Sequence, residues 1–119
     1  MDAATKELLA IAASARNEAD ENVLCTPYHA GAARFEGADD EAVAIAQDFE
    51  HRKHELPDRE RRIIEFGLKA AYEPRLVTDE DVASVRALGL SDAALVEIVS
   101  TALIAHNLSA LNQVFDLTL

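Results

Sequence analysis

Residues 92–115 are the segment that most constrains the fold of this 119-residue chain. The segment contains neither proline nor glycine, and its apolar residues recur at the three- and four-residue spacing of one helix face. The apolar positions are Leu95, Ile98, Val99, Ala102, Leu103 and Leu111. This pattern predicts one uninterrupted helix, the longest of the fold, with Ser91 as its N-terminal cap.

The rest of the chain divides into shorter segments of helical periodicity, and none shows the two-residue alternation of a half-buried strand. Alanine and leucine, both strong helix formers, are abundant throughout. We expect further helices over residues 4–16, 26–36, 38–55, 58–73 and 78–88. The sequence therefore predicts a single all-α domain of about six helices over residues 1–119.

Residues that cap or break helices set the expected boundaries. Thr26 is the expected N-cap of the second helix and Pro27 its first residue. Thr78 and Asp81 predict a capping box. Other boundaries are expected at Gly37, Pro57, Pro74 and Gly89, and the inward-facing residues are expected to be Leu8, Leu9, Ile11, Ala12, Ile63, Ile64, Phe66, Leu68 and Ala71.

The formal net charge of −11 narrows the classes of partner. An acidic surface repels phosphate backbones and anionic lipid, so we expect neither nucleic acid nor a membrane as a partner. The long C-terminal apolar segment is interrupted by Glu97, Ser100, Thr101 and His106, which argues against a transmembrane helix. The N-terminal residues MDAATKELLA do not resemble a signal peptide, so a cytoplasmic protein is expected.

The stretch NVLCTPYHAG, residues 22–31, carries the chain's one cysteine, Cys25, with His29 four residues later. A helix N-terminus and a nearby imidazole both lower the pKa of a thiol, so this spacing is compatible with an activated cysteine. The alternative is a small buried residue that packs ahead of a helix, because cysteine is among the residue types most often buried. A single cysteine excludes an intramolecular disulfide.

Three other sets of polar residues are candidates for a binding role. His51 and His54 lie near acidic residues at a helix end and are compatible with metal binding, although a helix C-terminus favours a protonated histidine without a metal. His106 is expected either to face a cavity or, more simply, to be a hydrogen-bonded core residue. The arginines of DRERRIIE, residues 58–65, indicate ion pairs within one helix. We expect no metal and no cofactor.

The segment KELLAIAAS, followed by CTPYHAGAARFEGADDE, resembles the core of the carboxymuconolactone decarboxylase and alkylhydroperoxidase D-like superfamily. In that core a C-x-x-C pair precedes a histidine, an alanine and a glycine, whose spacings His29, Ala33 and Gly37 reproduce. Residues 62–117 resemble the second half of the same superfamily, so the resemblance covers about residues 5–117.

The resemblance implies an all-α fold that assembles as homotrimers or homohexamers. It also implies that Cys25 attacks a hydroperoxide, that His29 moves the proton, and that Glu7 on the preceding helix assists it. Because the segment between Glu7 and Cys25 is about three residues longer than in the family, Glu18 or Glu21 is an expected substitute for Glu7. The first cysteine of the pair is replaced by Asn22, and an asparagine–arginine pair of the family appears as Asn112-Gln113.

Three functions are compatible with these residues. The first is a peroxidase-like oxidoreductase in which Cys25 is oxidised to a sulfenic acid and an external thiol reduces it. The second is acid–base catalysis by His29 and a carboxylate on a small lactone or keto acid, as in the decarboxylase branch of the superfamily. The third is a non-catalytic helical oligomer that binds a partner and in which Cys25 is inert.

Overall fold

The computed structural model describes residues 1–18 and 24–115, which form seven α-helices and two short 3₁₀-helices, with no strand among them. The α-helices are α1 (Ala3–Ala15), α2 (Cys25–Phe35), α3 (Asp40–Gln47), α4 (Phe49–Arg52), α5 (Asp58–Tyr72), α6 (Asp79–Arg86) and α7 (Asp92–Phe115). The 3₁₀-helices are η1 (Lys53–Glu55) and η2 (Pro74–Leu76). The predicted all-α class is confirmed, and the expected number of helices is close to the observed one.

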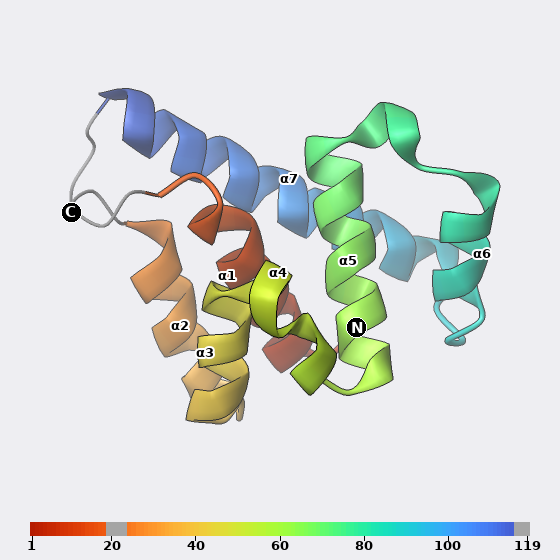
Figure 1. Ribbon diagram of the computed structural model, residues 1–119, viewed down its shortest axis with the longest axis horizontal. Helices are drawn as coiled ribbons and strands as arrows, with labels where there is room; N and C mark the ends of the chain where they lie inside the picture. The colour runs from red at the N-terminus through yellow and green to blue at the C-terminus, as the bar shows by residue number, and fades with distance from the viewer. Residues whose placement is uncertain (19–23, 116–119) are drawn as a thin grey trace.

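Helix α7 runs along the length of the molecule, and α1 and α5 both pack against it (Figure 1). Helix α1 also contacts α2, α3 and α5, which makes it the central helix of the fold. Helix α2 lies on the far side of α1 from α5, whereas α6 packs beside α5 at the opposite end of the molecule (Figure 1). Helix α1 therefore lies between α2 on one side and α5 on the other.

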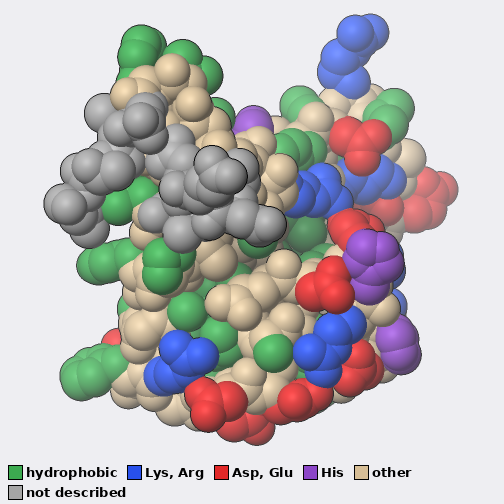
Figure 2. All heavy atoms as spheres, turned by 60° about the vertical axis from the view of Figure 1, so that its left-hand side comes forward, with side chains coloured by type: hydrophobic (Ala, Val, Ile, Leu, Met, Phe, Trp, Pro, Cys, Tyr) green, Lys and Arg blue, Asp and Glu red, His purple; other side chains and the backbone are tan. Residues whose placement is uncertain are grey.

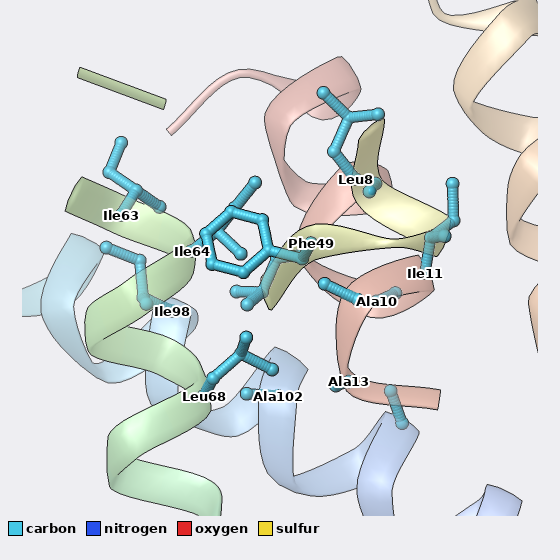
Figure 3. Close-up of a cluster of buried hydrophobic side chains, with 14 of the residues drawn as sticks. Leu8, Ala10, Ile11, Ala13, Phe49, Ile63, Ile64, Leu68, Ile98 and Ala102 are labelled. Carbon is cyan, nitrogen blue, oxygen red and sulfur yellow. The ribbon is translucent and has the colours of Figure 1, made fainter. Parts of the chain in front are cut away.

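The core is built by apolar faces of α1, α5 and α7, with α4 closing one side (Figure 3). All of the α1 and α5 residues expected to face inward are buried. Leu9, Ile63 and Ile98 are completely buried, and burial of each such side chain stabilises the fold by about 1.5–3 kcal/mol. The ring of Phe49 lies beside Ile64 in this core (Figure 3).

Gly67 lies where α5 crosses α1 and α7. A Cβ atom at this position would lie 2.7 Å from Cδ1 of Leu9 and 3.3 Å from Cγ2 of Ile98. The first of these distances is shorter than real Cβ contacts, so an alanine here would require the end of the Leu9 side chain to shift within a closely packed crossing.

Two sequence expectations about the helices are wrong. Residues 38–55 do not form one helix, because the backbone leaves helical geometry at Asp48, where φ is −130° and ψ is 48°. The change of direction places Phe49 in the core. In addition, Leu103 and Leu111 of α7 are exposed, and the buried face of this helix continues instead through Ala105, Ser109 and Asn112.

Most of the expected boundaries are observed. Thr78 and Asp81 form the reciprocal hydrogen bonds of a capping box at α6. Gly37 follows the last turn of α2 with a φ of 102°, a conformation that glycine adopts without strain. The backbone N–H of Ala94 donates to the Ser91 hydroxyl at the start of α7. The expected N-cap of α2 at Thr26 is wrong, because the carboxylate of Glu18 accepts the hydrogen bonds at this helix start.

Charged side chains interleave over part of the surface, where acidic, basic and histidine residues lie next to each other (Figure 2). Within α5, Arg61 pairs with Asp58 at 2.7 Å and with Glu65 at 3.4 Å, as the DRERRIIE segment predicted. Such exposed pairs contribute little individually, about 0–1 kcal/mol each. They account for charged residues of α5 without assigning them a binding role.

The outer face of α7 carries the largest set of exposed apolar side chains in the described residues. They are Val96, Leu103, Ile104, Leu108, Leu111, Val114 and Phe115. We refer to these seven residues as the α7 face. By length and composition α7 meets the requirements for crossing a membrane, but its opposite face packs on α1 and α5, as in a core helix of a folded domain.

Candidate functional site

The packing of α2 on α1 brings His29 to Glu7. Nδ1 of His29 and Oε2 of Glu7 are 2.6 Å apart, and both side chains are about one-fifth exposed. The two residues are 22 positions apart in the sequence, and the longer connection between α1 and α2 does not prevent the contact. Of the expected carboxylates that the structure describes, Glu7 and Glu18, Glu7 is therefore the one that contacts His29.

The His29–Glu7 pair lines a cavity of about 230 Å³ between α1, α2 and α7. Its wall is mainly apolar and includes Ala10, Ile104 and Ala105. The other lining residues are Lys6, Glu97, Ser100 and Thr101. This volume is below the range of about 300–1,000 Å³ typical of sites for drug-sized ligands, so the cavity suits a small molecule.

The contact with Glu7 fixes which nitrogen of His29 carries a proton. A carboxylate only accepts hydrogen bonds, so Nδ1 donates to Oε2 of Glu7. In the neutral imidazole the lone pair then lies on Nε2, which is the ring nitrogen left for the cavity. An imidazole oriented by a carboxylate in this way is a general base when neutral and a general acid after it has taken up a proton.

Cys25 has a different environment from His29. It is the first residue of α2 and is buried, with 7% of its surface exposed. The carboxylate of Glu18 accepts hydrogen bonds from the backbone N–H groups of Leu24 at 3.0 Å, Cys25 at 2.6 Å and Thr26 at 3.2 Å. Glu18 thus occupies the N-terminus of α2, where unpaired N–H groups concentrate positive potential.

This arrangement explains why Thr26 is not the N-cap. The Glu18 carboxylate accepts the hydrogen bonds that the N–H groups would otherwise donate to a capping hydroxyl. The helix therefore begins one residue before Thr26. The Thr26 hydroxyl instead lies 3.0 Å from the hydroxyl of Ser14, which is completely buried in α1. A hydrogen bond between the two side chains fixes the start of α2 on the end of α1.

The thiol of Cys25 is held in its protonated form. Burial raises its pKa, and the negative charge of Glu18, together with a hydrogen bond to that carboxylate, raises it further. Within the described residues no hydrogen bond joins Cys25 to His29, and Cys25 does not line the cavity. The environment is therefore opposite to the electropositive one that the Cys25–His29 spacing suggested.

The remaining candidate residues lie elsewhere. Asn17 Nδ2 donates to Nδ1 of His106 at 2.8 Å, and the His106 ring packs on Tyr72 at 4.1 Å, so this histidine is a hydrogen-bonded residue outside the cavity. His51 and His54 are exposed. In the part of the chain that the structure describes, no three His, Cys, Asp or Glu side chains are placed to hold a metal ion. Glu21 and Asn22 lie outside the described residues.

Sequence reasoning did not assign Ser100 and Thr101 to a site. It noted them only as interruptions of an apolar helix, although such interruptions on an otherwise apolar face are the signal that could have found them. Lys6 was also missed, because nothing in the sequence distinguishes a lysine at a cavity mouth from one on the surface.

Comparison of the chain with protein-family models and with curated proteins found no match. The assignment of a function therefore depends on the site itself.

Proposed function

We propose that this protein is an enzyme that uses His29, oriented by Glu7, to move protons on a small lactone or keto acid bound between α1, α2 and α7. The observation that carries the proposal is the 2.6 Å contact between Nδ1 of His29 and Glu7 at the wall of a cavity. It leaves Nε2 as the ring nitrogen available to substrate, and a positioned imidazole of this kind typically accelerates proton transfer by about 10²–10⁴-fold.

The mainly apolar wall supports this proposal in a second way. Apolar side chains on the wall offer few hydrogen bonds to water, so the interaction of a base with a carbon-bound proton is less attenuated there than at a polar surface. Neutral His29 accepts the proton from the carbon next to the substrate carbonyl, and the electron pair moves to the carbonyl oxygen. Protonated His29 then returns the proton at another carbon, which completes an isomerisation without any redox step.

The resemblance to the carboxymuconolactone decarboxylase and alkylhydroperoxidase D-like superfamily agrees with these roles, since it implies that the corresponding histidine and helix glutamate handle protons together. We include membership of that superfamily in the proposal. The observed contact between Glu7 and His29 supports it, because the resemblance predicts this pair.

The test uses α-angelica lactone, an uncharged enol lactone that gains ultraviolet absorbance when its double bond moves into conjugation. We expect wild type to accelerate this isomerisation and His29→Gln to abolish most of the acceleration. His51→Gln, which changes an exposed histidine, is the matched control. Decarboxylation of acetoacetate, measured as carbon dioxide release, tests the keto-acid class. Failure of wild type with both compounds would contradict the proposal.

A peroxidase-like activity of Cys25, reduced by an external thiol, is the second candidate. It is favoured by the position of Cys25 one helical turn before His29 on α2. Burial and the adjacent Glu18 carboxylate oppose it, because the thiolate is the nucleophile. Intact mass after a short organic hydroperoxide challenge separates the two candidates: a rapid gain of one oxygen on Cys25, slowed in His29→Gln, would favour the peroxidase.

We also propose that the protein forms a homotrimer or homohexamer in the cytoplasm. The α7 face supports self-association, because α7 carries no Asp, Glu, Lys or Arg between Ile98 and Phe115 although the chain has a net charge of −11. Like-charged copies approach each other most easily along an uncharged apolar surface. Light scattering after size exclusion should give a multiple of 12.9 kDa, and Leu108→Glu should reduce it. A monomeric wild type would contradict this proposal.

A further inference from the structure

Two hydroxyl-bearing residues of α7 line the cavity on the side away from α1 and α2. Thr101 is half-buried and Ser100 is exposed. A serine or threonine inside a helix usually donates to the backbone carbonyl four residues earlier, or to a nearby side chain. Neither residue does so within the described part of the chain, whereas the hydroxyl of Ser109, two turns further along α7, donates to the carbonyl of His106 at 3.0 Å.

The ionisable groups around the cavity provide no excess positive charge. Besides His29 they are Glu7, Glu97 and Lys6, so that the cavity is neutral when His29 is protonated and carries a net charge of −1 when His29 acts as a base. A substrate carboxylate would add a further negative charge beside Glu7 and Glu97. An uncharged molecule avoids this repulsion.

An uncharged substrate with a carbonyl group also matches the hydroxyl of half-buried Thr101, with that of Ser100 beside it. When the base removes a proton from the carbon next to a carbonyl, negative charge develops on the carbonyl oxygen. Hydrogen-bond donors placed at that oxygen stabilise the transition state. In this cavity the base lies on the α1–α2 side and the hydroxyls lie on α7, so a small substrate can contact both at once.

We propose that Thr101, assisted by Ser100, binds the carbonyl oxygen of an uncharged lactone, ester or ketone while His29 exchanges the proton on the neighbouring carbon. This inference rests on the proposed function and narrows its substrate class from lactones and keto acids to uncharged carbonyl compounds. The carbonyl accepts a hydrogen bond from the Thr101 hydroxyl, and this bond strengthens as the oxygen becomes negative. The proton that His29 takes up is the one that leaves carbon, so charge and atoms balance.

The experiment compares wild type with Thr101→Val, which keeps the shape of the side chain and removes the hydroxyl, and with Thr101→Ser, which retains it. Ser84→Ala removes a hydroxyl from half-buried Ser84 on α6, away from this cavity, and is the matched control. Two quantities are measured for each protein. They are kcat and KM for isomerisation of α-angelica lactone, and binding of unreactive γ-butyrolactone by ligand-observed NMR, with butyrate as the charged comparison.

We expect Thr101→Val to lower kcat by about 10- to 100-fold with a smaller change in KM, because the hydrogen bond matters most in the transition state. Thr101→Ser should restore most of the rate, Ser84→Ala should behave as wild type, and butyrate should bind more weakly than γ-butyrolactone. Unchanged thermal melting of Thr101→Val would show that the loss is local.

The outcomes separate this inference from the proposed function. If His29→Gln loses activity and Thr101→Val keeps it, the proposed function stands and the role of Thr101 is wrong. If wild type does not isomerise the lactone, the proposed lactone activity is wrong, and binding alone decides. Weaker γ-butyrolactone binding in Thr101→Val would then support the carbonyl-binding wall, whereas equal binding, or butyrate binding as tightly, would overturn it.

Discussion

Cys25 and His29 lie one turn apart on α2, and each faces a glutamate from the α1 side of the molecule, yet the two carboxylates act in opposite ways. Glu18 accepts hydrogen bonds from the backbone around Cys25 and holds the thiol in its protonated form by raising its pKa. Glu7 accepts a hydrogen bond from Nδ1 of His29 and leaves Nε2 available as a base. The first contact suppresses the reactive form of a side chain, whereas the second one promotes it.

The difference follows from the charge of each reactive form. A thiolate is negative, so a neighbouring carboxylate opposes it, and burial adds to the penalty. An imidazole becomes positive when it takes up a proton, so a neighbouring carboxylate stabilises the product of that transfer. A glutamate therefore opposes the reactive form of a cysteine and favours the reactive form of a histidine, although both contacts are made to the same helix.

The largest expected effect comes from His29→Gln. This change preserves the approximate size of the side chain but removes the titratable nitrogen, so isomerisation of α-angelica lactone should fall by about 10²–10⁴-fold. Cys25→Ala tested in parallel should retain the wild-type rate, because Cys25 does not line the cavity. An equal loss of activity in both variants would contradict the separation of the Cys25 and His29 environments.

Glu7→Gln should produce the next largest effect. Glutamine can still accept a hydrogen bond from Nδ1 of His29, but it lacks the charge that stabilises the protonated ring. We expect kcat to fall by about tenfold or more, with a smaller change in KM. Glu60→Gln, which changes a half-buried glutamate of α5 outside the cavity, is the control. A Glu7→Gln enzyme as active as wild type would mean that Glu7 has no role in proton transfer.

Glu18→Gln should make Cys25 more reactive. Loss of the carboxylate charge lowers the pKa of the thiol, so alkylation by iodoacetamide at pH 8 should become severalfold faster. The weakened cap should also destabilise the protein by about 0.5–2 kcal/mol. Glu36→Gln, at the other end of α2, is the matched control, and alkylation measured well below the unfolding midpoint excludes reaction through the unfolded state. No change in the rate would show that Glu18 does not control the thiol.

The smallest expected effect is on stability at alkaline pH. Because folding raises the pKa of Cys25 above its ordinary value of 9.0, the folded state binds this proton more tightly than the unfolded state. The stability that results is complete below pH 9 and is lost as the pH rises above it, by at most about 1.4 kcal/mol per pH unit. Chemical denaturation between pH 8 and pH 10.5 should show a steeper decline for wild type than for Cys25→Ala. Parallel curves would contradict the raised pKa.

Much of the fold was predictable because it depends on local signals. The helical spacing of apolar residues around Leu9, around Ile63 and around Ile98 identifies three core helices from the sequence alone. Thr78 with Asp81 marks a helix start that the structure confirms. The break at Asp48 was not predictable, because apolar spacing continues through it. Only the advantage of placing Phe49 in the core reveals it, and that advantage depends on helices distant in the sequence.

The candidate site was predictable only in part. The resemblance put forward His29 and Glu7, and the structure places them together. The environment of Cys25 could not be foreseen, because the helix N-terminus that favours a thiolate is occupied by a side chain from the preceding loop, Glu18. The position of Thr101 in the cavity wall depends on how α7 crosses α1, which no local pattern encodes.

Gly67 lies behind the cavity walls and does not itself line the cavity. Its two close neighbours, Leu9 and Ile98, are each adjacent in sequence to a residue of the cavity wall, Ala10 on α1 and Glu97 on α7. The absence of a methyl group on α5 therefore leaves room for the ends of the Leu9 and Ile98 side chains directly behind the two walls. A smaller residue at Leu9, alone or together with Gly67→Ala, therefore changes the packing behind both walls without altering any residue that lines the cavity.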